Sequence, residues 1–244
     1  MHKILALFVL TVLITTAIPA QKNLRLLSYN IRNGKGMDNA TDYDRIVGVL
    51  QKVNANVIGL QELDSITRRS GDTDVLGLLA DKTGMHAVYG AALTYQGGKY
   101  GVGVLSKEKP LQHYTIPLPG REEPRILLVV EFKKYVVFNT HLSLTEADRL
   151  ASVAIINEQA ARFTKPLYLM GDLNAAPASP MIHALQQDWR LLSGTAYTFP
   201  APAPNRCIDY IFSRHTSKKK RITATVINEP MASDHRPVLV EVGK

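Results

Sequence analysis

The stretch of sequence that decides the fold is Pro166-Leu-Tyr-Leu-Met-Gly-Asp-Leu-Asn174. Its first half is a short apolar run, which predicts a buried strand over residues 166–170. The run stops at Gly171, and two polar side chains, Asp172 and Asn174, come directly after it. Residues two apart in an extended segment project to the same side, so these two side chains can share one face. The stretch therefore predicts a buried strand that carries polar groups at its end.

Several other segments have the same design and end in a residue that can bind a cation or move a proton. They are Asn30 after Leu-Leu-Ser-Tyr, Glu62 after Ile-Gly-Leu-Gln, His141 after Val-Phe-Asn-Thr, and Asp234-His235 after Met-Ala-Ser. Residues at strand ends can meet at one edge of a sheet, where the active sites of α/β folds collect. Each residue alone has an ordinary structural explanation, such as a surface carboxylate or a buried histidine. Their recurrence favours a single shared site.

The remaining patterns predict many strands and two well-marked helices. Apolar runs predict strands at residues 24–29, 56–61, 86–89, 101–106, 111–116, 125–132, 135–139, 208–213, 222–227 and 237–242. Thr41-x-x-Asp44 resembles a helix cap and is followed by apolar residues at helical spacing, from Ile46 to Val53. A second cap at Thr145 predicts a helix to about residue 163, and a further helix is expected to begin near residues 75–79. We therefore expect an α/β fold with two packed mixed β-sheets and helices outside.

The first twenty residues read as a secretory signal peptide. A short basic start precedes an apolar run over residues 4–18, which is shorter than the roughly twenty residues that span a bilayer comfortably. Cleavage near Ala20 is preferred over retention as a membrane anchor, so no membrane span is expected afterwards. The expected organisation is a signal peptide at 1–20 and one catalytic domain at 21–244. This predicts an exported protein, periplasmic or extracellular, which we expect to be a monomer.

The composition is that of an ordinary globular protein with a basic surface. Hydrophobic residues make up 45% and charged residues 20% of the chain, and the net charge is +8. This balance argues against disorder, and a cationic surface suits an anionic partner such as a phosphate ester, a nucleic acid or an acidic lipid head group. The single cysteine, Cys207, excludes an internal disulfide and is interpreted as a small buried residue.

Six short motifs follow one another along the chain: Tyr29-Asn-Ile, Leu60-Gln-Glu62, Asn139-Thr-His-Leu142, Gly171-Asp-Leu-Asn174, Asp209-Tyr-Ile-Phe212 and Ser233-Asp-His-Arg-Pro237. In this order they resemble the motifs of the endonuclease/exonuclease/phosphatase superfamily, which has the DNase I-like fold. The resemblance spans about residues 24 to 242. It implies a four-layered α/β sandwich and hydrolysis of a phosphate ester by water, assisted by Mg²⁺ or Mn²⁺.

The resemblance also implies roles for individual residues. Glu62 matches the principal metal ligand, with Asn30 and Asp234 close to the ion. Asp172 and Asn174 match the pair that orients the attacking water, and His235 resembles a general base or charge stabiliser that Asp209 hydrogen-bonds. His141 matches a residue that binds a phosphoryl oxygen, and Arg125 resembles a phosphate-contacting arginine. These types fit the chemistry, because a hard divalent ion prefers carboxylate and amide oxygens and a positioned base can activate water.

One position departs from the pattern of some DNA-repair members. Arg32 stands where those members carry an acid, so a second metal site near the first strand is not expected. Arg32 can meet a substrate phosphate with two hydrogen bonds, or it can form a structural salt bridge.

The choice of substrate is expected to lie in the loops. The candidates are Arg68-Arg-Ser-Gly71, the segment from Tyr95 to Tyr100 and the segment from Pro117 to Arg121. Tyr95 or Tyr100 could stack on a base or flank a head group, although the segment could also be a plain hairpin turn. The basic run at residues 218–221 lies between two predicted strands and is interpreted as a solvated turn.

Three functions remain open on the sequence alone. The first is a phosphodiesterase or phosphomonoesterase that acts on a small or lipid-linked phosphate ester. The second is a secreted DNase I-like endonuclease, so nucleic acid is a possible but less favoured substrate. The third is a non-catalytic phosphate-binding module on the same fold, which the full set of candidate ligands and bases argues against.

Overall fold

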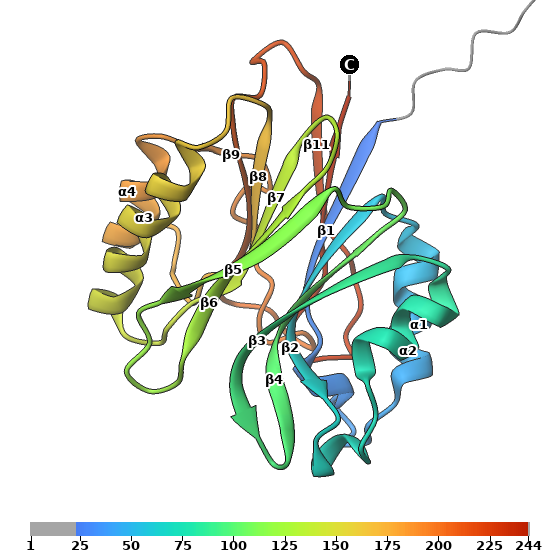
Figure 1. The fold of residues 1–244 in the computed structure, drawn as a ribbon. Coiled ribbons are helices and arrows are strands. Elements are labelled where there is room, and N and C mark those ends of the chain that lie inside the picture. Colours follow the sequence, from blue (N-terminus) through green and yellow to red (C-terminus); the bar gives the residue numbers. More distant parts are fainter. Residues whose placement is uncertain (1–22, 244) are drawn as a thin grey trace, which may run out of the picture.

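The computed structural model of the protein describes residues 23–243, so the predicted signal peptide at 1–20 lies outside the described residues. Within this range the chain forms two six-stranded sheets (Figure 1). The first sheet has the order β11-β12-β1-β2-β4-β3 and the second β5-β6-β7-β8-β10-β9. The strands are β1 Leu24–Asn30, β2 Val57–Ser65, β3 His86–Tyr95, β4 Gly98–Ser106, β5 Gln112–Leu118, β6 Arg125–Glu131, β7 Val136–His141, β8 Leu167–Asp172, β9 Arg190–Leu191, β10 Asp209–Arg214, β11 Ile222–Val226 and β12 Val238–Val242.

The described helices cover the outer faces of the two sheets. Helices α1 (Tyr43–Val53) and α2 (Val75–Thr83) lie against the first sheet, and α3 (Glu146–Ala160) and α4 (Pro180–Gln186) lie against the second (Figure 1). Short 3-10 turns at Arg32–Gly34 and Arg68–Ser70 follow β1 and β2. The result is a four-layered α/β sandwich, which confirms the expectation of two mixed sheets flanked by helices.

The strands form this sandwich because both of their faces are apolar. Leu26 belongs to the core between the two sheets, whereas Leu27 packs into the core beneath α1 and α2. Val137 of the second sheet likewise belongs to the central core, and its neighbour Phe138 belongs to the core beneath α3 and α4. Alternation along a strand sends successive side chains to opposite faces. Near-continuous apolar runs are therefore what central strands of a sandwich covered by helices require.

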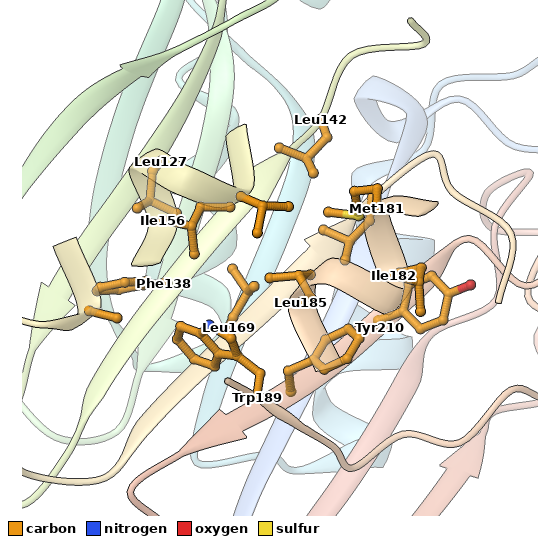
Figure 2. Close-up of a cluster of buried hydrophobic side chains, with 14 of the residues drawn as sticks. Leu127, Phe138, Leu142, Ile156, Leu169, Met181, Ile182, Leu185, Trp189 and Tyr210 are labelled. Carbon is orange, nitrogen blue, oxygen red and sulfur yellow. The ribbon is translucent and has the colours of Figure 1, made fainter. Parts of the chain in front are cut away.

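Figure 2 shows the outer core of the second sheet. Ile156 of α3, Leu185 of α4 and Leu169 of β8 belong to one buried cluster, which Trp189 joins from the segment after α4. The indole N–H of Trp189 donates to Asn157 Oδ1 at 2.8 Å, so its polar atom is satisfied. This packing fixes the two helices against the second sheet, whose strands carry His141, Asp172 and Asp209.

The helix predictions need three corrections. The N-cap of α1 is Asp42, whose side chain accepts a hydrogen bond from the Arg45 N–H at 2.9 Å, and not Thr41. Helix α3 ends at Ala160, before residue 163. Helix α4 was not predicted, although it begins with an N-cap serine followed by a proline at its first position. The expected helix at residues 75–79 is confirmed as α2.

The strand predictions are confirmed in number except for the two-residue β9. The β3–β4 hairpin is longer than expected, because the strands continue to Tyr95 and restart at Gly98. The segment from Tyr95 to Tyr100 is thus a hairpin turn with strand on both sides. The basic run at residues 218–221 is exposed between β10 and β11, as expected of a solvated turn.

Candidate active site

The polar strand ends meet at one edge of the sandwich because of how the strands are paired. β1 and β2 are parallel, and so are β7 and β8, so each pair ends on the same side. His141 and Asp172 are register partners at the ends of β7 and β8. β10 is antiparallel to β8, and its first residue, Asp209, lies opposite Asp172. β12 is antiparallel to β1, so Asp234 and His235, which precede β12, come to the same edge.

Asp172 lies at the centre of this edge. Its Oδ2 atom accepts a hydrogen bond from Asn30 Nδ2 at 3.1 Å and lies 3.5 Å from His141 Nε2 and 3.6 Å from His235 Nε2. Its Oδ1 atom accepts the backbone N–H of Asn174 at 3.0 Å. The carboxylate is 2% exposed, so these groups from both sheets hold it in a largely dry environment. One carboxylate oxygen therefore joins the amide and the two imidazoles.

His235 is paired with a second buried carboxylate. Its Nδ1 lies 2.9 Å from Asp209 Oδ2, and Thr198 Oγ1 donates to the same oxygen at 2.5 Å. The Phe199 ring covers the imidazole at a centroid distance of 4.8 Å. Burial lowers the pKa of His235, but the negative charges of Asp209 and Asp172 outweigh burial and raise it to about 10. His235 is therefore held as an imidazolium with a fixed ring orientation.

His141 has the opposite charge preference. Burial lowers its pKa to about 4, and the attraction of Asp172 does not compensate. At neutral pH the site thus combines one neutral and one charged imidazole on the same carboxylate. The two histidines can accept and donate different hydrogen bonds in the same site.

The sequence predicts Glu62 at the end of a strand, and this is wrong. Glu62 lies within β2, at an irregularity of the strand. β2 continues to Ser65, and its pairing with β4 shifts register between Leu60 and Leu63. Glu62 lies in this bulge with a positive φ of 58°. A bulge turns a side chain away from the regular alternation, and left-handed backbone at a non-glycine residue is strained and concentrates at functional sites. The bulge thus directs Glu62 to the edge of the sheet.

The carboxylate of Glu62 lies among other negative charges. Its Oε1 accepts Asn30 Nδ2 at 2.9 Å. Burial raises its pKa, and the negative charges of Asp234 and Asp172 add to that rise. A bound cation would relieve this repulsion.

Asp234 lies beside the last residue of β1. Ser233 Oγ donates to the Asn30 carbonyl at 2.8 Å and lies 3.3 Å from Asp234 Oδ1, which fixes the loop before β12 against β1. Arg32 Nε lies 3.6 Å from Asp234 Oδ2, so Arg32 takes part in the salt bridge that its sequence position allowed.

A polar cavity of about 520 Å³ opens beside Glu62 and Asp234. Its lining consists of the first-sheet edge and the loops that follow β1 and β2: Arg32, Asn33, Lys35, Asn39, Thr41, Glu62, Arg69 and Asp234. Two carboxylates on one cavity wall are hard oxygen donors of the kind that Mg²⁺ uses together with water and phosphate. The predicted metal-binding residues Glu62 and Asp234 therefore face a common space.

A second group could also hold a cation. Asp172, Asp209 and His235 offer ligand atoms within 4.8 Å of one another. Their atoms already satisfy one another, because His235 Nδ1 lies 2.9 Å from Asp209 Oδ2. Glu62 and Asp234 fit a metal ion better, since they face the cavity. Asn30 fits as an oxygen ligand only if its amide turns, because its Oδ1 accepts the Arg32 N–H at 3.0 Å while its Nδ2 faces the carboxylates.

Two further predicted residues, Arg125 and Asn174, lie on the second-sheet side of the site. Arg125, 7% exposed, lines a small hollow together with His141 and Tyr100, and its Nη1 pairs with Glu123 at 3.0 Å. Asn174 has a positive φ of 50°, and its Nδ2 donates to the Leu142 carbonyl at 3.0 Å, so the loops after β7 and β8 are tied together.

Arg68 does not line either hollow, and its side chain is exposed. The neighbouring Arg69 lines the large cavity instead. The sequence predicts only that the loop Arg68–Gly71 takes part in recognition. Two further residues of the site are not predicted from the sequence: Lys35, which lines the cavity, and Thr198, which hydrogen-bonds Asp209. No motif marks these three positions, and only the Gly-rich composition of residues 33–38 indicated that Lys35 lies in a loop beside the site.

None of the helices within residues 23–243 is long and apolar enough to cross a membrane. Comparison with solved structures finds the same architecture in proteins of low sequence identity. An endonuclease/exonuclease/phosphatase from Beutenbergia cavernae is 21% identical, with a TM-score of 0.74 over 91% of this chain and 72% of that protein. A mannosyl-6-phosphatase from Bacteroides thetaiotaomicron is 19% identical, with a TM-score of 0.71 over 91% and 100%. TDP2 from Caenorhabditis elegans is 18% identical, with a TM-score of 0.67 over 91% and 98%.

None of the curated proteins matches the chain significantly. The model of the Endonuclease/Exonuclease/phosphatase family, however, matches residues 27–235, which include every predicted site residue. Members of this family are typically hydrolases that act on phosphate esters, and the acidic groups described above could bind a divalent metal. The match covers most of the sequence and agrees with the two-sheet fold, so the chain belongs to the endonuclease/exonuclease/phosphatase family.

Proposed function

We propose that the protein is a divalent-metal-dependent phosphoesterase that hydrolyses a small or lipid-linked phosphate ester with an activated water. The observation that carries the proposal is the surrounding of Asp172 Oδ2, which has Asn30 at 3.1 Å and the Nε2 atoms of His141 and His235 at 3.5 and 3.6 Å. A carboxylate next to a neutral and a charged imidazole offers a proton acceptor and two partners for phosphoryl oxygens in one site.

The residues suggest a division of labour for this reaction. Asp172 and Asn174 hold the attacking water, whose oxygen forms the new bond to phosphorus while the bond to the ester oxygen breaks. Asp172 accepts the proton of the water, and the leaving oxygen takes a proton from solvent in the open cavity. The pKa of His235, raised to about 10 by Asp209 and Asp172 against the effect of burial, favours a charge-stabilising role over that of general base. His141 and Arg125 would contact the remaining phosphoryl oxygens.

Glu62 and Asp234 would hold the metal ion, Mg²⁺ or Mn²⁺, with Asn30 as a third ligand after a turn of its amide. Such an ion supplies neutralisation of the charge that develops on the phosphate and on the leaving oxygen. The raised pKa of Glu62, caused by burial and by the nearby carboxylates, supports this assignment because the carboxylates need a positive partner in order to remain charged together.

A small substrate agrees best with the shape of the site. The cavity of about 520 Å³ lies within the range of volumes that hold small organic ligands. A protein with the same fold is described as a mannosyl-6-phosphatase, so a sugar phosphomonoester is the first substrate to test. We also propose that the protein is exported to the periplasm or the extracellular space, and that residues 21–244 form a monomer.

The test is hydrolysis of a panel of phosphate esters with Mg²⁺ or Mn²⁺, comprising aryl mono- and diesters, sugar phosphates, glycerophosphodiesters and plasmid DNA. Glu62→Gln and Asp172→Asn keep the size of the side chains, and each is expected to lower the rate by about 100-fold or more. Glu146→Gln, an exposed carboxylate at the start of α3, is the matched control and is expected to leave the rate unchanged. EDTA is expected to abolish turnover.

The outcomes separate the candidate functions. Rapid cleavage of plasmid DNA with strong inhibition by salt, and slow hydrolysis of the small esters, would favour the nuclease. Equal inactivity of the native protein and both site variants across the panel would favour the non-catalytic binding module.

A further inference from the structure

We infer that the cavity beside Glu62 and Asp234 binds a second anionic group of a small substrate, such as a second phosphate or a carboxylate, through Lys35, Arg69 and Arg32. The inference deepens the proposed function and rests on it for the position of the reacting phosphate. That phosphate belongs next to Asp172, His141 and His235.

The cavity extends from Glu62 and Asp234, which would hold the metal ion, away from the second-sheet groups that would contact the reacting phosphate. All of its lining residues come from the first-sheet side, and His141, Asp172 and Arg125 of the second sheet are not among them. Arg125 and His141 line a different, much smaller hollow of about 10 Å³. Of these two hollows, the one toward the first sheet therefore has the room for a further group of a substrate bound at the sheet edge.

Lys35 is the cation of the cavity that lacks a partner. Among residues 23–243 its half-buried side chain makes no hydrogen bond or ion pair. Arg32, by contrast, lies 3.6 Å from Asp234, and Arg69 pairs with Asp64. An ammonium group that is partly withdrawn from water and unpaired favours an anionic partner, and hydrogen bonds between charged groups are the strong ones.

Arg69 is held rigidly at the cavity wall. Its Nε and Nη2 atoms donate to the two oxygens of Asp64 at 2.6 and 2.9 Å. Its guanidinium lies over the rings of Tyr95 and Tyr100, at 4.6 and 5.2 Å from the centroids. The side chain is still 32% exposed, so donors remain available toward the cavity. A planar, preoriented guanidinium suits the two oxygens of a phosphate or carboxylate.

The loop that carries Lys35 is fixed before any ligand arrives. The Gly34 N–H donates to the Ile31 carbonyl at 2.7 Å, and the Asp42 N–H donates to the Gly34 carbonyl at 2.9 Å. Gly34 has a φ of 81°, and a Cβ there would lie 2.4 Å from a ring carbon of Tyr43, so only glycine fits. A cavity that is preformed costs less ordering on binding.

The test compares ligands that differ only in the second anion. Alkanediol bisphosphates with chains of three, four and six carbons are matched with the corresponding ω-hydroxyalkyl monophosphates. Binding is measured by calorimetry with Ca²⁺ in place of Mg²⁺ in order to slow turnover. The native protein is expected to bind at least one bisphosphate about tenfold more tightly than its monophosphate partner. Lys35→Met is expected to reduce that advantage to about threefold or less, and Lys35→Glu to remove it.

Lys52→Met is the matched control. It removes the same charge from an exposed position on α1, outside the cavity, and is expected to retain the tenfold preference. Arg69 is not the residue to replace first, because its loss would leave Asp64, 1% exposed, without its partner.

Each result decides the inference. Equal binding of bisphosphates and monophosphates by the native protein would overturn it, as would a preference that survives Lys35→Met. Tighter binding of a single-stranded oligonucleotide than of every bisphosphate would assign the cavity to a nucleic-acid backbone and would also overturn it. Because the readout is binding, a protein that hydrolyses no ester would refute the proposed function and still leave this result intact.

Discussion

Replacement of Asp209 by asparagine tests the electrostatics of the site most directly. Asp209 is 2% exposed, and its Oδ2 lies 2.9 Å from His235 Nδ1. Asparagine keeps the shape and an acceptor oxygen for that contact, but it removes the negative charge. The perturbation therefore isolates the interaction between the carboxylate and the imidazolium.

The size of the effect follows from the pKa of His235. That pKa rises from its usual 6.5 to about 10 even though burial lowers it, and Asp209 is the first of the charges that raise it. The whole shift corresponds to roughly 5 kcal/mol, because each pKa unit is worth about 1.4 kcal/mol. Asp172 and Asp234 share in the effect, so Asp209→Asn is expected to cost about 2–3 kcal/mol.

The loss must depend on pH in a defined direction. The folded pKa of His235 lies above the unfolded pKa, so the stabilisation is complete below about pH 6.5 and disappears as the pH rises toward about 10. Urea denaturation of the metal-free protein in EDTA measures the difference in free energy of unfolding between native protein and variant. NMR titration of the imidazole follows the pKa itself. Asp72→Asn, at an exposed position, is the control and is expected to change stability by less than about 0.5 kcal/mol.

Two results would refute the reasoning. The first is a loss of stability that is the same near pH 6 and near pH 10, which would show that Asp209 acts through packing alone. The second is an unchanged titration of His235 in the variant. Either result would remove the basis for describing His235 as an imidazolium at neutral pH.

Three other changes test different parts of the structure. Glu62→Gln is expected to impair catalysis but to stabilise the metal-free protein by about 1 kcal/mol, because burial and the charge of Asp234 disfavour the Glu62 carboxylate. A lower free energy of unfolding of this variant in EDTA would contradict the prediction. Cys207, which is buried and has its pKa raised by burial to about 11, is expected to react with a thiol reagent only after unfolding, so fast labelling of the folded protein would count against it. Leu169→Ala is expected to lower the free energy of unfolding by about 2–5 kcal/mol and Leu111→Ala, at a 65% exposed position, by less than about 0.5 kcal/mol; similar values for both would contradict the described core.

The general position of the site was predictable because it depends on strand ends. Asn30 and His141 follow apolar runs of the length of buried strands, and parallel neighbours must end on the same side. β10 and β12 pair antiparallel with β8 and β1, so Asp209 at the start of β10 and the loop residues Asp234 and His235 before β12 come to the same edge. Local sequence pattern and sheet geometry agree here, so several short motifs sufficed to indicate one edge.

Details that depend on distant contacts were not predictable. The bulge at Glu62 arises from the register between β2 and β4, which no alternation pattern of β2 alone encodes. The choice between Arg68 and Arg69 is decided by Asp64 and by two tyrosines of the β3–β4 hairpin. Neighbouring arginines in a 3-10 turn point in different directions, and their sequence gives no indication of which one faces a cavity.

Helix α4 was missed for a related reason. Its start signal, Ser179 followed by Pro180, is present, and Ile182 accordingly donates its N–H to Ser179 Oγ at 3.4 Å. The helix has seven residues, too few to be stable by intrinsic propensity, so its stability comes from the packing of Met181 and Leu185 against the second sheet. Sequence periodicity over so short a span is weak.

The pairing of β1 with β12 bears on how the protein is made. The N-terminal strand lies between β2 and a strand from the far end of the chain, with Leu24 opposite Val242 (Figure 1). Until residues 238–242 have been synthesised, β1 therefore has one unpaired edge. The strands of the second sheet end at Arg214, so they are synthesised before the edge that also needs Asp234 and His235. The polar edge around Asp172 is therefore among the last parts of the described fold that can form.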